Sequence, residues 1–229
     1  MLLTTFKPES KIHLIIYDLD GTLIDSRRDI VNAVNWTLSE LGLKELAAEQ
    51  ISSFVGNGVN NLMRQALEVV EVPRTAPFLE RSIKIFRKRY GEHLLDETSL
   101  YPSVRKVLEF FKDRKQAVIT NKPEEFSLAI LKGLGIDSYF FKVVGGDRGF
   151  PKKPDPAAVF DILSLARISP EETLLVGDSA TDIRTGRNAG VRTAAVTYGF
   201  GKRPEIETAR PDFLLEDLEE LTRCPLLKS

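Results

Sequence analysis

Two aspartates stand two residues apart, directly after an apolar run at residues 12–17. Such a run, ending in a polar turn, is typical of a strand that is buried on both faces. Asp18 and Asp20 placed together need a cation, and carboxylate and phosphate oxygens suit Mg²⁺. A turn whose aspartates only cap a helix would have the same pattern, so the pair alone leaves both interpretations open.

Three further polar groups follow later along the chain. Thr120 and Asn121 close a second apolar run, Lys153 lies in a KKPDP segment, and Asp178 and Asp182 follow a third run. Each also has a structural interpretation: a strand residue, a solvated loop lysine, or a helix start with a capping box. Because ligands bind beyond the carboxyl ends of strands in open parallel sheets, their order favours one shared site.

Short apolar runs and helical patterns alternate along most of the chain. Residues 116–120, 173–176 and 192–196 are the further apolar runs. Between them, apolar residues recur at helical spacing: Val104, Val107, Leu108 and Phe111; Phe126, Ile130, Leu131 and Leu134; Val159, Ile162, Leu163 and Ala166. This alternation predicts an α/β fold, a Rossmann-like parallel sheet with helices on both faces.

Residues 24–98 break the alternation, because they show helical spacing and no convincing buried strand. The apolar sets are Ile30, Val34, Leu38 and Leu41; Leu62, Ala66, Leu67 and Val70; Ile83, Phe86, Tyr90 and Leu94. We therefore expect an all-helical cap domain at 24–98, inserted into a discontinuous core domain formed by 1–23 and 99–229.

The run DLDGTL at residues 18–23 resembles the first motif of the haloacid dehalogenase-like hydrolases. Thr120, Lys153 and Asp178 resemble the second, third and fourth motifs of that family, in the required order. The resemblance extends from residue 12 to about residue 215. It implies an enzyme that transfers a phosphoryl group.

The resemblance implies catalytic roles for three residues. Asp18 would be the nucleophile that forms an aspartyl-phosphate intermediate, and Asp20 would be the general acid and base. Lys153 would neutralise the charge of the phosphoryl group and of the nucleophile. Asp155 stands where relatives often have histidine, which alters the local charge and leaves the lysine in place.

The implied cofactor is Mg²⁺. Asp18, Asp178 and the main-chain carbonyl of Asp20 would bind it, with water and phosphate completing the shell. Asp182 has three open roles: it would bind the metal through water, orient Asp178 or Lys153, or only cap its helix.

Substrate contacts are expected from both parts of the chain. Thr120, with Asn121 beside it, would hydrogen-bond the phosphoryl group, together with the backbone amides around Gly21 and Asn121. Thr22 is a further expected substrate contact. Substrate choice would depend on the cap.

In the cap, Gly56, Asn57 and Gly58 would offer amides to a substrate carboxylate, with Arg64 as a candidate cation. A plain turn between helices explains the glycines equally well. The cap segment VGNGV, combined with DLDGTLIDS, KP and GDS, resembles the phosphoglycolate phosphatases of the family.

The sequence thus predicts a magnesium-dependent phosphomonoester hydrolase, with 2-phosphoglycolate as the leading substrate. Pyrophosphate and sugar phosphates are the alternative substrates. A phosphomutase and a noncatalytic module that binds a phosphorylated metabolite are the alternatives of another class.

Composition narrows the class of protein. The 32 basic and 33 acidic residues give no reason to expect a nucleic acid or an anionic membrane as a partner. A single cysteine, Cys224, excludes an intrachain disulfide and favours a reducing cytoplasm. No segment approaches membrane-spanning length. We expect a cytoplasmic monomer or homodimer that acts on a small phosphorylated metabolite.

Overall fold

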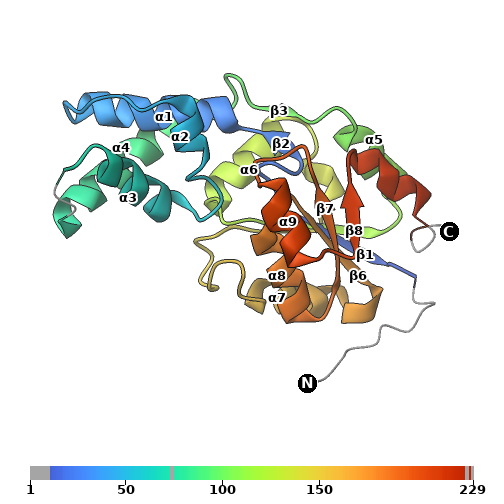
Figure 1. Cartoon of the computed structure of the whole chain (residues 1–229). Coiled ribbons are helices and arrows are strands. Elements are labelled where there is room, and N and C mark those ends of the chain that lie inside the picture. Colours follow the sequence, from blue (N-terminus) through green and yellow to red (C-terminus); the bar gives the residue numbers. More distant parts are fainter. Residues whose placement is uncertain (1–10, 73–74, 225–226, 228–229) are drawn as a thin grey trace.

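The computed structural model describes residues 11–72, 75–224 and 227. Its centre is a six-stranded parallel sheet in the order β5-β4-β1-β6-β7-β8 (Figure 1). The strands are β1 (Leu14–Tyr17), β4 (Lys115–Ile119), β5 (Lys142–Val144), β6 (Thr173–Gly177), β7 (Arg192–Val196) and β8 (Phe213–Leu215). The predicted α/β class is confirmed. The sequence did not reveal β5 and β8, because these edge strands are three residues long and only partly buried.

Helices cover both faces of the sheet. They are α5 (Val104–Phe110), α6 (Glu124–Gly133), α7 (Ala157–Ala166), α8 (Ala180–Ala189) and α9 (Arg203–Ala209). The alternation of side chains along β1 places Ile15 and Tyr17 in one apolar cluster with α5 and α6, and Leu14 and Ile16 in another with α7. Every side chain of β1 is buried, which explains its continuous apolar run.

Four helices form a separate group at one end of the molecule (Figure 1). They are α1 (Arg27–Glu40), α2 (Ala48–Ser52), α3 (Val59–Val69) and α4 (Ala76–Glu92). Their apolar faces make a cluster of their own, joined by Phe126 of α6. The two chain segments that lead into and out of this group pair as short antiparallel strands, β2 (Ile24–Asp25) and β3 (Ser99–Leu100). We call residues 26–98 the helical insertion; the exact domain boundaries stay a prediction.

The strand register decides where the site forms. Tyr17 at the end of β1 is level with Val118 of β4 and Val176 of β6. Because the three strands are parallel, the polar residues that follow them meet at one edge of the sheet. Within the described ranges, no helix is long and apolar enough to cross a membrane.

Candidate active site

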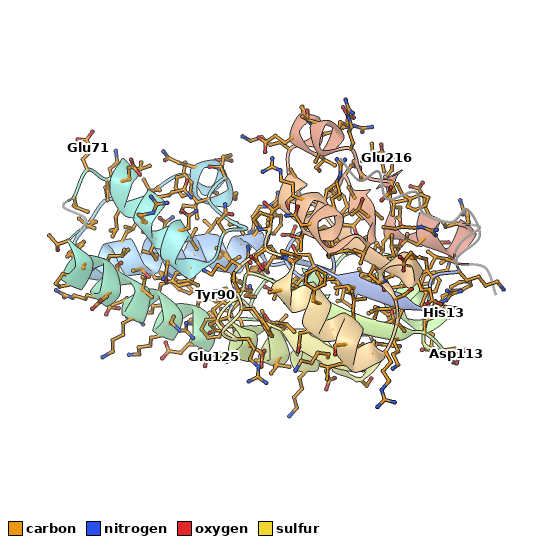
Figure 2. All side chains as sticks on the ribbon, turned by 90° about the horizontal axis from the view of Figure 1, so that it is seen from below. His13, Glu71, Tyr90, Asp113, Glu125 and Glu216 are labelled. Atoms are coloured by element: carbon orange, nitrogen blue, oxygen red, sulfur yellow. The ribbon has the colours of Figure 1, made fainter. Side chains whose placement is uncertain are left out.

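A cavity of about 260 Å³ lies where the carboxyl ends of the strands face the helical insertion. Figure 2 shows Tyr90 of α4 at the junction between the insertion and the core, with Glu125 of α6 nearby. The predicted site residues on its walls are Asp18, Asp20, Thr120, Asn121, Lys153 and Asp178 from the core, and Gly56, Asn57 and Gly58 from the insertion.

Lys153 joins two buried carboxylates. Its Nζ lies 2.7 Å from Asp18 Oδ1 and 2.6 Å from Asp182 Oδ1, and its side chain is 5% exposed. The other oxygen of Asp182 accepts hydrogen bonds from the Ser179 amide and hydroxyl, at 3.1 and 2.6 Å. Asp182 therefore both caps the start of α8 and holds Lys153, two of the roles that the sequence left open.

Asp178 is held by the loop that follows β7. Its Oδ2 accepts the amides of Phe200 at 2.6 Å and Gly201 at 3.1 Å. Gly21 packs against the same carboxylate with a φ of +85°, and a Cβ there would lie 2.3 Å from Asp178 Oδ2. The first motif thus needs glycine at this position for both its backbone conformation and its close contact.

The donor set fits a divalent cation. Asp18, Asp178 and Asp182 are buried, and one carboxylate oxygen from each lies within 4.8 Å of the others. Asp18 Oδ1 is buried without a hydrogen bond of good geometry from the described residues, although Lys153 Nζ is close. Three carboxylates against one ammonium leave excess negative charge, which a hard cation with oxygen ligands would compensate.

Burial, and after it the excess negative charge, shifts the pKa values of the carboxylates in this cluster. Burial raises the pKa of Asp18 to about 8; Lys153 opposes this rise, and Asp182 and Asp178 add to it. Burial, followed by the charge of Asp182, raises the pKa of Asp178 to about 7. Burial would lower the pKa of Lys153, but the carboxylates of Asp18 and Asp182 outweigh it and raise that pKa.

We therefore expect the metal-free protein to lose stability as the pH rises. The raised pKa values of Asp18 and Asp178, about 8 and about 7, mean that the folded state binds more protons than the unfolded state from about pH 4 upward. The free energy of unfolding should fall by roughly several kcal/mol between about pH 4 and about pH 8, the interval from the unfolded-state to the folded-state pKa values. Urea titrations in EDTA measure the free energy of unfolding at each pH. Asp18→Asn should make its dependence on pH weaker. A free energy of unfolding that stays constant or rises with pH in wild type would contradict the expectation.

Asp20 lies beside a second buried lysine. Lys122 Nζ donates to its two carboxylate oxygens at 2.9 and 3.2 Å, and Ser26 Oγ donates at 2.5 Å. Lys122 also donates to the Tyr90 hydroxyl at 2.6 Å and lies over the ring of Tyr90. A lysine one residue beyond Thr120-Asn121 is expected from the sequence to face solvent, as Lys152 is beside Lys153, and for Lys122 this prediction is wrong: its side chain is 4% exposed.

Asn121 connects three parts of the site. Its Nδ2 donates to Gly56 O of the insertion at 2.9 Å, and its Oδ1 accepts the Lys153 amide at 3.0 Å. The side chain therefore fixes the lysine loop and the insertion, in a place where the sequence predicted a contact with substrate. Thr120 is on the cavity wall as expected, and its hydroxyl accepts the Lys122 amide at 3.2 Å.

Three predicted substrate contacts are placed differently. The amides of Gly21 and Thr22 donate to Ile24 O and Leu19 O, so their backbone bonds close the turn and are not free for a phosphoryl group. Arg64 is exposed, donates to Asn61 and lies outside the cavity. The helical periodicity of the sequence did not show whether Arg64 faces the cavity or solvent, because this depends on how the neighbouring helices pack against α3.

Asp155 has a local structural role. Its Oδ1 accepts the amide of Ala157 at the start of α7, at 2.9 Å. The departure from the family pattern at this position therefore stabilises a helix end next to Lys153.

Known proteins resemble this chain over almost its full length. A family model for haloacid dehalogenase-like hydrolases matches residues 15–196. The phosphoglycolate phosphatase of Aquifex aeolicus is 38% identical over 214 residues, which is 93% of this chain and 96% of that protein. The phosphoglycolate phosphatase of Pseudomonas putida is 36% identical over 219 residues, covering 93% and 80% of the two chains.

A solved structure agrees with this relationship. The crystal structure of a predicted phosphoglycolate phosphatase from Haemophilus somnus superimposes with a TM-score of 0.88 at 31% identity, over 93% of this chain and 97% of that one. The predicted family and the predicted enzyme class, a phosphatase, are confirmed by these relatives. The chain belongs to the haloacid dehalogenase-like hydrolases.

Proposed function

We propose that this phosphatase uses Mg²⁺ and an aspartyl-phosphate intermediate to hydrolyse 2-phosphoglycolate to glycolate and phosphate. The reaction is supported mainly by the buried group of Asp18, Lys153, Asp178 and Asp182, of which the first three line the cavity. The relatives named phosphoglycolate phosphatase support the substrate.

The chain's own residues supply both halves of the reaction. A carboxylate oxygen of Asp18 attacks phosphorus, the bond to the leaving oxygen breaks, and Asp20 gives that oxygen a proton. Asp20 then takes a proton from water, whose oxygen attacks the phosphorus of the aspartyl phosphate. Phosphate leaves, and the carboxylate of Asp18 is restored.

The reaction also requires that the negative charges of the nucleophile and of the phosphoryl group be neutralised. Lys153 lies within 2.7 Å of Asp18, where it can neutralise both the nucleophile and the transferring group. Asp18, Asp178 and the main-chain carbonyl of Asp20 would hold Mg²⁺, with Asp182 next to them. When bound, Mg²⁺ would neutralise phosphate charge and orient the phosphoryl group for attack.

Lys122 is the best candidate for meeting the substrate's carboxylate. It is a cavity-lining cation next to Asp20, and it lies between the core and Tyr90 of the insertion. Gly58 also lines the cavity and precedes α3 without a side-chain cap, so the first turn of α3 favours an anion. We therefore propose that Lys122 and this helix start replace Arg64 as the carboxylate site.

The experiment measures phosphate release with Mg²⁺ from 2-phosphoglycolate, pyrophosphate, several sugar phosphates and p-nitrophenyl phosphate. Wild type should prefer 2-phosphoglycolate. Lys122→Met should lower kcat/KM for that substrate by about 100-fold, because a buried charge partner is lost. It should lower kcat/KM less than about tenfold for the sugar phosphates, whose leaving groups also need the proton of Asp20 but carry no carboxylate.

The control is Lys88→Met, which removes an exposed lysine from α4 and should leave both rates unchanged. An equal loss on every substrate in Lys122→Met would contradict the carboxylate site. A wild type that prefers another substrate would overturn 2-phosphoglycolate, and isomer formation without free phosphate would indicate a mutase.

A further inference from the structure

The loop at residues 198–201, after β7, contacts both the Asp178 carboxylate and the segments that lead into and out of the helical insertion. The loop takes no part in the proposed catalytic steps. Its amides nevertheless hydrogen-bond to Asp178, so contacts that hold the loop in place also hold that carboxylate in place.

On the side of the core, the loop is packed tightly. The amides of Phe200 and Gly201 both donate to Asp178 Oδ2, at 2.6 and 3.1 Å. A Cβ on Gly199 would lie 2.3 Å from both Asp178 Cβ and Gly21 O. A shift of the loop would therefore be transmitted directly to the carboxylate, because no space separates them.

On the side of the insertion, the loop meets Arg27, the first residue of α1. The guanidinium carbon of Arg27 lies 4.6 Å from the centroid of the Phe200 ring, and Nη2 donates to Gly199 O at 3.4 Å. A cation over an aromatic ring is attracted by the negative potential of the ring face, so this contact holds the loop against the start of α1.

The segment leaving the insertion contacts the same loop. The ring of Tyr101 packs on that of Tyr198 with centroids 4.4 Å apart, and the Tyr198 hydroxyl donates to Thr22 O at 2.8 Å. Both segments that connect the insertion to the core thus contact this loop, one through Arg27 after β2 and the other through Tyr101 after β3.

We propose that Arg27 is a positioning residue for metal binding: through Phe200 and Gly199 it holds the 198–201 loop so that Asp178 is aimed at the cation. This rests on the proposed function in that Asp178 binds Mg²⁺. Arg27 also begins the helical insertion, so the placement of the insertion and the affinity for Mg²⁺ are linked. By reciprocity, bound Mg²⁺ then favours the placement seen in this structure.

The test is calorimetric titration of the full-length, substrate-free protein with Mg²⁺. Arg27→Met should weaken Mg²⁺ binding by about tenfold, which is at the low end of the loss of affinity caused by removing a group that orients a metal ligand. At saturating Mg²⁺, kcat of this variant should approach that of wild type. Arg27→Lys keeps a cation over the ring and should recover most of the affinity. Phe200→Leu should match Arg27→Met, and the double variant should be no weaker than either one.

Arg28→Met is the matched control, because Arg28 is the next residue, its side chain is 74% exposed, and its ion pair with Glu97 is on the surface. Equal Mg²⁺ affinity in Arg27→Met and Arg28→Met would overturn the inference. If Arg27→Met does not fold, unchanged affinity in Phe200→Leu overturns it equally. A wild type that neither binds Mg²⁺ nor releases phosphate would instead overturn the proposed function.

Discussion

Asp18→Asn should lower kcat/KM for the phosphorylated substrate by at least about four orders of magnitude, since it removes the nucleophile. The same change removes one of three clustered carboxylates from a buried site. The metal-free variant should therefore be as stable as wild type or more stable, by about 1–2 kcal/mol near pH 8, where the raised pKa of Asp18 makes its charge costly. Phosphate release and urea unfolding measure the two effects.

The matched control is Asp113→Asn. Asp113 is exposed and lies far from Tyr90 and the cavity (Figure 2). This variant should keep the activity and the stability of wild type. Activity of Asp18→Asn within about tenfold of wild type would exclude Asp18 as the nucleophile, because a missing nucleophile has no substitute of comparable efficiency. Inactivity combined with unfolding would point to a structural role.

Lys153→Met should cause the largest loss of stability of the single changes considered. Its ammonium contacts Asp18 at 2.7 Å and Asp182 at 2.6 Å, with little exposure to water. Removing one partner of a buried ion pair leaves uncompensated charge and costs about 3–5 kcal/mol. Loss of charge stabilisation in the transition state should also lower kcat by at least about 100-fold. Mg²⁺ should restore part of the stability, because it supplies positive charge to the same carboxylates.

Lys152→Met provides the comparison, since Lys152 is the preceding residue and its side chain is exposed. Urea unfolding with EDTA and then with Mg²⁺ distinguishes the two variants. Equal stability of Lys153→Met and Lys152→Met would show that Lys153 does not hold the acidic cluster together. A normal rate in Lys153→Met would exclude its proposed catalytic role.

The sequence alone determined the arrangement of the core. The apolar runs of β1, β4, β6 and β7 are continuous because their side chains are buried on both faces, so local composition identifies them. The polar residues that follow the first three of these strands meet because parallel strands end at the same edge. Asp18, Thr120 and Asp178 were therefore predictable as a group, whereas Lys153 follows the edge strand β5 and was identified only through the resemblance to the family.

Contacts between the core and the insertion were decided only by the tertiary structure. Nothing local distinguishes a buried Lys122 from a solvated lysine, and its partner Tyr90 is 32 residues away on another helix. Asn121 and Gly56 are 65 residues apart, and Arg27 and Gly199 are 172 apart. Periodicity shows that a helix has an apolar face, but the partner of each polar side chain depends on how two separately packed units meet. For that reason Arg64 was predicted at the cavity and lies outside it, whereas Lys122 was predicted in solvent and lies on the cavity wall.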